Sequence, residues 1–251
     1  MPRPDPKEKL DALKPKQGPS QMIIAVVVVI VLVLGGVIAL IASQSGGDPS
    51  TNGSSLPKGA IKDGDGIVAY PGAAQKGAPR VDLYEDFQCP ICNELEKTNG
   101  STINAMAKSG KIKLVYHMMT FLDQNEGNTA SSLAANASYC AADAGKFPEY
   151  HKANFAGQPA QEGVGYTVAD VKKFGKQAGI TGDALKKFNT CVDDNTYADY
   201  VKATETRSEK NGVNGTPSVF FNGTQLDQNS QDYAALLSQK GSFTTVLKSH
   251  T

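Results

Sequence analysis

The sequence predicts an α/β fold, with a single transmembrane helix in front of one globular domain. The domain begins with two strand-like segments on either side of a helix, continues with a long helical stretch, and ends with a strand pair and a further helix. The 251 residues carry 25 basic and 25 acidic side chains, so the formal net charge is zero. Nucleic-acid phosphates select basic surfaces, so we expect no nucleic-acid partner.

The transmembrane helix is predicted from residues 22–42, which form a run of 21 residues without a charge. At about 1.5 Å per residue, such a run crosses the roughly 30 Å hydrocarbon layer of a bilayer. Five basic side chains precede it and the next is Lys58, so the positive-inside rule places residues 1–21 in the cytoplasm and the later residues outside. The run is longer than a signal-peptide core of about 7–15 residues, which favours a retained single-pass anchor in the cell membrane over a cleaved leader.

Residues 43–58, rich in Ser, Gly, Pro and Asn, predict a flexible linker, and one domain is expected over residues 59–251. Within the domain, residues 81–87 alternate as a strand, residues 92–108 are typical of a helix interrupted near its central glycine, and residues 111–119 return to strand periodicity. This order is a βαβ unit, which predicts parallel pairing of the two strands.

Helical signals dominate the next stretch, about 128–211, before strands return. Thr167, with Asp170 three residues later, is typical of a helix N-cap. It precedes an apolar stripe that begins with a valine. Residues 217–226 predict two short strands around an Asn-Gly dipeptide, which is favoured in two-residue hairpin turns. A closing helix is expected at about residues 231–240, with a short one after it.

The chain has four cysteines, and thiols outside the membrane are not held reduced, so an even count predicts two disulfides. Pairing Cys89 with Cys92 leaves Cys140 with Cys191. The second bridge would close a long loop and stabilise the fold by about 4 kcal/mol, so we interpret it as structural. Zinc sites of four cysteines usually show two short-spaced pairs, and no histidine stands at ligand spacing to the first pair. We therefore expect no metal and no cofactor.

The pair Cys89 and Cys92 closes so small a loop that it would make a weak staple. Cys89 follows a predicted strand and begins a helix, with Pro90 at the first helical position. The unpaired N–H groups and the positive end of the helix dipole stabilise a thiolate there, which is the form that attacks disulfides. Cys92, one turn deeper, suits the resolving role. We interpret the pair as a redox-active dithiol.

The segments YEDFQCPIC and GVNGTPSVFFNG resemble the DsbA family of thiol:disulfide oxidoreductases in the thioredoxin superfamily, and especially its membrane-tethered actinobacterial members. The resemblance covers about residues 58–251. It implies a thioredoxin-like fold with an inserted helical domain at about 128–211. In proteins of this family, a disulfide ties the helical insertion. It also implies that Pro217 is a cis-proline facing the active disulfide, and that Thr216 offers its backbone to an extended substrate.

The resemblance implies an extracytoplasmic enzyme that donates disulfides to unfolded or reduced exported proteins. It also implies that a quinone-linked integral-membrane oxidase reoxidises this enzyme. A reductase or isomerase using the same dithiol is the first alternative. Isomerases of the superfamily commonly add a dimerisation domain, and the sequence shows no sign of one, so we expect a monomer. The second alternative is a peptide-binding or chaperone module whose cysteines are only structural.

Two positions depart from the family pattern. Many thioredoxin-like proteins carry a buried acid six residues before the first cysteine, where this chain has Leu83. Glu85 and Asp86 are the candidates to replace it in proton transfer, with a raised pKa if buried; an acid in solvent at a strand end is the alternative. Ile91 stands where strongly oxidising members often have histidine, which predicts a Cys89 pKa above about 3.5 and a potential less oxidising than about −120 mV.

Overall fold

The structure, a computed structural model, describes residues 56–251. The predicted cytoplasmic segment, the anchor at 22–42 and all but the end of the linker lie outside the described residues. Among residues 56–251, no helix combines the length and the apolar character that a bilayer crossing needs.

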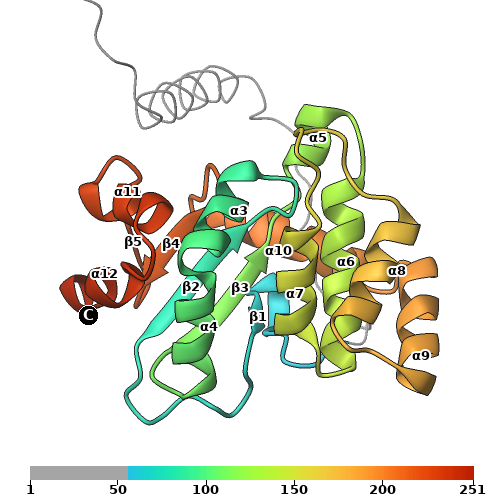
Figure 1. The fold of residues 1–251 in the computed structure, drawn as a ribbon, viewed down its shortest axis with the longest axis horizontal. Helices are drawn as coiled ribbons and strands as arrows, with labels where there is room; N and C mark the ends of the chain where they lie inside the picture. The colour runs from blue at the N-terminus through green and yellow to red at the C-terminus, as the bar shows by residue number, and fades with distance from the viewer. Residues whose placement is uncertain (1–55) are drawn as a thin grey trace, which may run out of the picture. The chain divides into compact units, whose positions relative to one another are not determined.

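A five-stranded mixed sheet in the order β1-β3-β2-β4-β5 forms the centre of the domain (Figure 1). Its strands are β1 (Ile67–Val68), β2 (Arg80–Glu85), β3 (Lys113–Met118), β4 (Ser218–Phe221) and β5 (Thr224–Gln225). β2 and β3 pair in parallel, which confirms the predicted βαβ unit, and the other neighbours pair antiparallel. β1 was not predicted, because two residues are too few to show a period.

The crossover between β2 and β3 is a continuous helical segment made of α3 (Pro90–Leu95), the π-helix η3 (Glu96–Gly100) and α4 (Ser101–Lys108). The predicted interruption is therefore a widened turn rather than a break. Gly100 has a steric reason to be glycine, since a Cβ atom there would lie 2.2 Å from Glu96 Oε2. The glycine leaves space for the Glu96 carboxyl group to turn inward.

Helices cover both faces of the sheet. α11 (Gln231–Ser238) packs against α3, and α12 (Phe243–His250) packs against α4, whereas α10 (Ala198–Lys210) crosses behind the strands (Figure 1). β2 is consequently buried on both faces, including Asp82, which the strand pattern placed on the second face. The buried Asp82 carboxylate forms a salt bridge with Arg80 at 2.6 Å and a hydrogen bond with His117 at 2.8 Å.

The helical insertion between β3 and β4 contains α5 (Leu122–Glu126), α6 (Ala130–Asp143), α7 (Phe147–Ala156), α8 (Val168–Gln177), α9 (Gly182–Asp193) and α10. All but α5 lie within the predicted stretch. A disulfide between Cys140 and Cys191 joins α6 to α9, with the two Cα atoms 5.8 Å apart. α7 was not predicted as a separate helix, because its buried face includes the polar side chains of His151 and Asn154.

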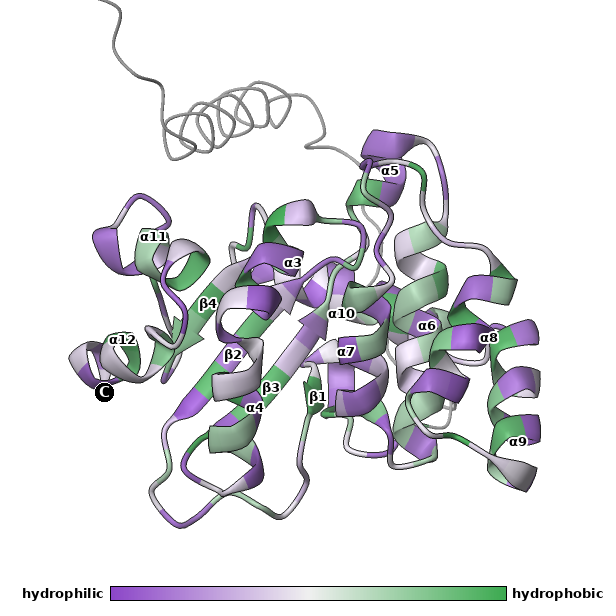
Figure 2. Cartoon of the chain, viewed as in Figure 1, coloured by the Kyte–Doolittle hydropathy of each residue, from purple (hydrophilic) through white to green (hydrophobic). Residues whose placement is uncertain are grey.

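Local signals fix several element ends. Thr167 and Asp170 form the predicted capping box of α8, but Val168, expected on its apolar stripe, is 44% exposed at the first helical position. Asn222 and Gly223 have φ angles of 50° and 84°, as a type I′ hairpin turn requires. α11 ends two residues before the predicted boundary. The solvent-facing sides of α8 and α9 are polar (Figure 2).

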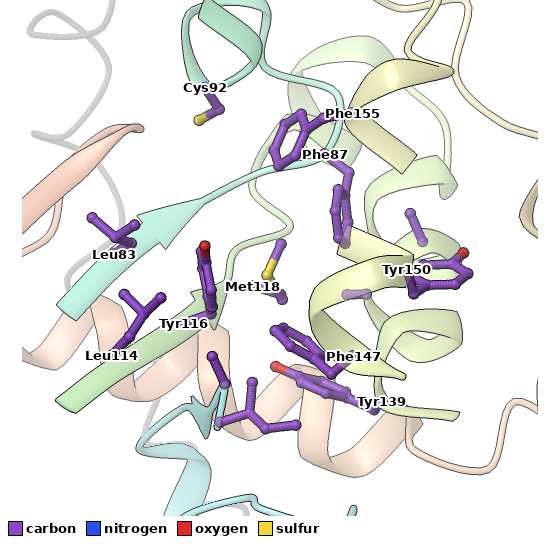
Figure 3. Packing of buried hydrophobic residues seen from close by; sticks show 14 of the residues in the cluster. Leu83, Phe87, Cys92, Leu114, Tyr116, Met118, Tyr139, Phe147, Tyr150 and Phe155 are labelled. Carbon is purple, nitrogen blue, oxygen red and sulfur yellow. The ribbon is translucent and has the colours of Figure 1, made fainter. Parts of the chain in front are cut away.

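The hydrophobic core is continuous from the sheet into the insertion. Tyr116 of β3 packs against Phe147 of α7 with ring centroids 5.6 Å apart, and Phe87, just after β2, lies 5.0 Å from Phe155 (Figure 3). The insertion therefore shares one core with the sheet and supports the segment that carries the first cysteine pair.

Candidate active site

The cysteine pair lies at the junction of β2 and α3. Cys89 is the N-cap residue of α3 and Pro90 is its first residue, as the sequence predicts. The Cys89 side chain is 7% exposed and Cys92 is 0% exposed. Both are free thiols in this structure, and Cys92 lies on the sheet side of α3 (Figure 3). A reacting partner therefore reaches Cys89 before Cys92.

Thr216 and Pro217 lie beside this junction, because β4 pairs with β2 and brings the segment before it next to the end of β2. Cys89 Sγ donates a hydrogen bond to the Thr216 carbonyl oxygen at 3.5 Å. The peptide bond between Thr216 and Pro217 is cis. The Pro217 carbonyl oxygen accepts hydrogen bonds from Tyr233 and Gln228, which hold the segment in place. The structure thus brings Thr216 and Pro217 to the dithiol.

The two thiols differ in acidity. A hydrogen bond from the Cys92 thiol is the main cause of a lowered pKa at Cys89. Burial opposes this shift, and the backbone N–H groups of Cys92 and Ile91 support it. Burial raises the pKa of Cys92 well above its ordinary value of 9.0, and the neighbouring Cys89 raises it further. Cys89 is therefore the better nucleophile, and Cys92 is the thiol that holds its proton.

Glu85 is fully buried at the end of β2, so the alternative of a solvent-exposed strand-end acid is wrong. Its Oε2 atom lies 2.8 Å from His151 Nε2, and its Oε1 atom has no hydrogen-bond partner among the described residues. Burial, with a smaller contribution from the Cys89 charge, raises the pKa of Glu85 well above its ordinary value. Glu85 also acts electrostatically on Cys92. It is a buried acid that can exchange a proton near the second thiol.

Asp86 is also buried, but its oxygens are engaged in holding the loop. Asp86 Oδ1 accepts from Ser131 Oγ at 2.5 Å and from the Gln88 backbone N–H at 2.9 Å, and Oδ2 accepts from the Leu122 backbone N–H at 3.3 Å. Burial raises the pKa of Asp86 well above its ordinary value despite these bonds. Of the two acids that the sequence proposes for proton transfer, Glu85 has the free oxygen atom.

A loop of the insertion holds the backbone on which Cys89 sits. Gln158 Nε2 donates to the carbonyl oxygens of Phe87 at 2.8 Å and Cys89 at 3.0 Å, while its Oε1 accepts from Asn93 at 2.8 Å. Tyr166 donates from its hydroxyl to the same Phe87 carbonyl oxygen at 2.6 Å. Sequence reasoning missed both residues, because a loop glutamine and a lone tyrosine carry no periodic or motif signal.

His151 of α7 lies between two buried carboxyl groups, a cluster that the sequence did not predict. Beyond its contact with Glu85, its Nδ1 atom lies 3.9 Å from Glu96 Oε2. Donor atoms of the three side chains lie within 4.8 Å of one another, a spacing at which a metal ion could be held. The 2.8 Å contact is nevertheless that of a hydrogen bond, shorter than the about 3.3 Å between two ligands of a tetrahedral zinc ion. A proton can therefore be shared between His151 and Glu85.

The cysteine pair at the start of α3, the unequal thiol acidities and the buried acid can together perform thiol–disulfide exchange. Cys89 can attack or be attacked, and Cys92 can form or release the internal bridge while a proton moves to or from it. Cys140 and Cys191 are bonded to each other and lie on α6 and α9, away from this junction. They are not part of the exchange.

Comparison with known proteins places this geometry in a family. The family model described as thioredoxin matches residues 74–239, more than half of the chain. The solved structure of the MdbA protein, a thiol-disulfide oxidoreductase from Corynebacterium matruchotii, is 26% identical with a TM-score of 0.56, covering 71% of this chain and 89% of that one. Oxidised DsbA of Mycobacterium tuberculosis is 25% identical with a TM-score of 0.53, covering 71% of this chain and 94% of that one.

A third structure, MdbA from Actinomyces oris, has a TM-score of 0.64 at 23% identity and covers 80% of this chain and 95% of that chain, which shows the fold. A curated relative, the serine/threonine-protein kinase PknE of Mycobacterium tuberculosis, is 25% identical over 166 residues. That alignment spans 62% of this chain but only 29% of the kinase. The chain belongs to the thioredoxin family, and its fold is that of the DsbA-like members.

Proposed function

We propose that this chain is a thiol:disulfide oxidoreductase that donates a disulfide to exported proteins through Cys89 and Cys92. The observation that carries the proposal is the pair of thiols at the N-terminus of α3: Cys89 is the more acidic and the more exposed of the two, and Cys92 is fully buried with a raised pKa. The names of the MdbA and DsbA structures support the same chemistry.

In the oxidised enzyme, a substrate thiolate attacks Cys89 Sγ and forms a mixed disulfide. The Cys89–Cys92 bond breaks, its electron pair moves to Cys92, and the Cys92 thiolate takes up a proton. A second substrate thiolate then attacks the substrate sulfur of the mixed disulfide and releases Cys89 as a thiolate. The substrate loses two electrons and the dithiol gains them. The lowered pKa of Cys89 makes it a good leaving group in this last step.

Thr216 contributes to substrate binding in this proposal. Its carbonyl oxygen lies 3.5 Å from Cys89 Sγ, so an extended chain that pairs with this backbone would place its own cysteine next to Cys89. The domain works outside the membrane, attached through the segment at 22–42. A quinone-linked membrane oxidase restores the Cys89–Cys92 bridge. Both proposals follow from the apolar run and from the family resemblance.

The direction of exchange is tested by the reduction potential of the Cys89–Cys92 pair. The full chain, kept in detergent, is equilibrated with glutathione buffers and the thiols are then trapped and counted. We expect a potential near or above roughly −180 mV, the range of disulfide donors. A potential near or below roughly −270 mV, where thioredoxin lies, would make the protein a reductase instead. A pair that cannot be reduced without unfolding would remove the redox proposal altogether.

A further inference from the structure

A water-accessible groove runs along the side of α3 and η3 that faces α7. It has a volume of about 960 Å³. Pro90, Glu96, Asn104, Glu149, Lys152 and Gln158 are among the residues that line it. The Glu96 side chain lines this groove and is 8% exposed.

A chain of ionisable groups leads inward from the Glu96 side chain. The Glu96 Oε2 atom lies 3.9 Å from His151 Nδ1, and His151 Nε2 lies 2.8 Å from Glu85 Oε2. Glu85 ends β2 and Cys92 lies on the sheet side of α3, and the charge of Glu85 contributes to the raised pKa of Cys92. The Glu85 Oε1 and Glu96 Oε1 atoms are buried without a hydrogen-bond partner among the described residues. Buried carboxyl oxygens without partners are costly, which indicates a use beyond packing.

We propose that Glu96 and His151 form a proton relay that connects Glu85, and through it Cys92, to the groove. The proposal rests on the dithiol function above and adds the path by which its proton is exchanged with solvent. When the Cys89–Cys92 bond breaks, Glu85 gives a proton to the Cys92 thiolate. The His151 Nε2–H replaces the Glu85 proton, His151 Nδ1 takes the proton of Glu96, and Glu96 recovers one from water in the groove. One solvent proton is consumed for each proton that Cys92 gains.

The distances fit a relay with one mobile step. The 2.8 Å contact between His151 and Glu85 is a direct hydrogen bond, whereas 3.9 Å between His151 and Glu96 is too long for one. A single water or a rotation of the Glu96 side chain closes that gap. Because Gly100 has no side chain, the Glu96 carboxyl group can occupy the space beside it.

The position of the groove explains why a relay is useful. In the proposed reaction, the bound substrate covers Cys89 on the side of Thr216, just when Cys92 needs a proton. Cys92 and Glu85 are both 0% exposed and have no direct route to water. The groove lies on the α7 side of α3, so its water remains accessible while substrate is bound.

The ionisable groups around the cluster come from each element packed against it. Cys89 and Cys92 lie at the start of α3, and Tyr116 lies on β3. The ionisable side chains that line the groove besides Glu96 are Tyr70, Glu94, Lys97, Glu149, Lys152 and Lys240. Burial, with the charge of Glu85, raises the pKa of Glu96 to about 8, so Glu96 can hold a proton at neutral pH. Burial lowers the pKa of His151, which keeps the imidazole neutral and able to carry a proton in either direction.

The test measures the rate at which dithiothreitol reduces Cys89–Cys92 in the oxidised full chain, in detergent with a metal chelator present. Glu96→Gln keeps the shape of the protonated carboxyl group but cannot relay a proton. We expect its rate to fall by about 10-fold or more, within the range of general acid–base catalysis. Glu96→Ala should fall similarly and regain rate in proportion to added acetate, which enters the groove and replaces the missing carboxyl group. Glu149→Gln removes a carboxyl group that lines the same groove but does not contact His151. Its reduction rate should equal the wild-type rate and should not change with added acetate.

Three results would overturn the relay. They are a wild-type rate in Glu96→Gln, a wild-type rate in Glu96→Ala, and a loss in Glu96→Ala that acetate does not restore. Thermal melting of each variant identifies a rate loss caused by unfolding, and either Glu96 variant that folds suffices for the decision. If the wild-type bridge itself does not react with dithiothreitol, the proposed function fails. If it reacts and the Glu96 variants react equally well, only the relay fails.

Discussion

The disulfide between Cys140 and Cys191 offers a quantitative test of how the helical insertion is held. The two residues are separated by 51 positions and join α6 to α9. In the loop-entropy model, closing a loop of this length stabilises the fold by about 4 kcal/mol at 25 °C, because the unfolded chain loses freedom. Replacing both residues by alanine should therefore lower the free energy of unfolding by about 4 kcal/mol. For a domain of this size, the melting temperature should fall by about 8–16 °C.

The assay is urea unfolding of the wild-type chain and the Cys140→Ala/Cys191→Ala variant, with the Cys89–Cys92 pair kept reduced in both. The denaturant slope should rise in the variant, because its unfolded state is more expanded. The matched control is Cys89→Ala/Cys92→Ala, which also removes two sulfur atoms but opens no long loop. Equal losses in the two double variants would refute the reasoning, since the loss would then reflect sulfur packing rather than loop closure. A loss below about 1 kcal/mol would refute it as well.

Three further predictions follow from the site. The folded-state pKa of Glu96 is raised from 4.5 to about 8, so between these pH values the folded state holds a proton that the unfolded state has released. The free energy of unfolding should therefore fall as the pH rises through that window. Urea unfolding at several pH values measures this, and the free energy of unfolding of Glu96→Gln should fall less than that of the wild type. Gly100→Ala would place a methyl group 2.2 Å from Glu96 Oε2, so the carboxyl group must move. The rate at which dithiothreitol reduces Cys89–Cys92 should then drop as in Glu96→Gln. An unchanged rate would contradict this. Gln158→Ala removes the donor to the carbonyl oxygens of Phe87 and Cys89, so the free energy of unfolding should fall by about 1–3 kcal/mol. Amide hydrogen exchange at the start of α3 should become faster. Amide protection equal to that of the wild type would show that the loop needs no such support.

Much of the fold was predictable because its signals are local. The alternation before and after the crossover helix, the capping box at Thr167 and the Asn222–Gly223 turn are each read within a few residues, and the structure confirms them. β1 is only two residues long and gave no pattern. α7 gave none because polar side chains occupy its buried face. In both cases tertiary contacts, rather than local propensity, decide the element.

The site divides in the same way. Cys89, Cys92 and Pro217 were recognisable because they sit in short motifs with fixed spacing. Glu85 is hydrogen-bonded to His151, which lies 66 positions away, and no spacing rule connects the two residues. The support from Gln158 also comes from 69 positions away in the chain. Such contacts exist only once the insertion has packed against the sheet.

The brevity of the outer strands has a consequence under the proposed function, in which the protein meets unfolded chains. Both edges of the sheet are formed by strands of two residues, β1 and β5. Exposed strand edges are templates on which extended polypeptides aggregate, and very short ones offer few unpaired backbone groups. An unfolded client that meets this domain therefore finds little backbone to extend along, apart from the segment at Thr216. The short edges would therefore limit unproductive backbone pairing with the proposed substrates.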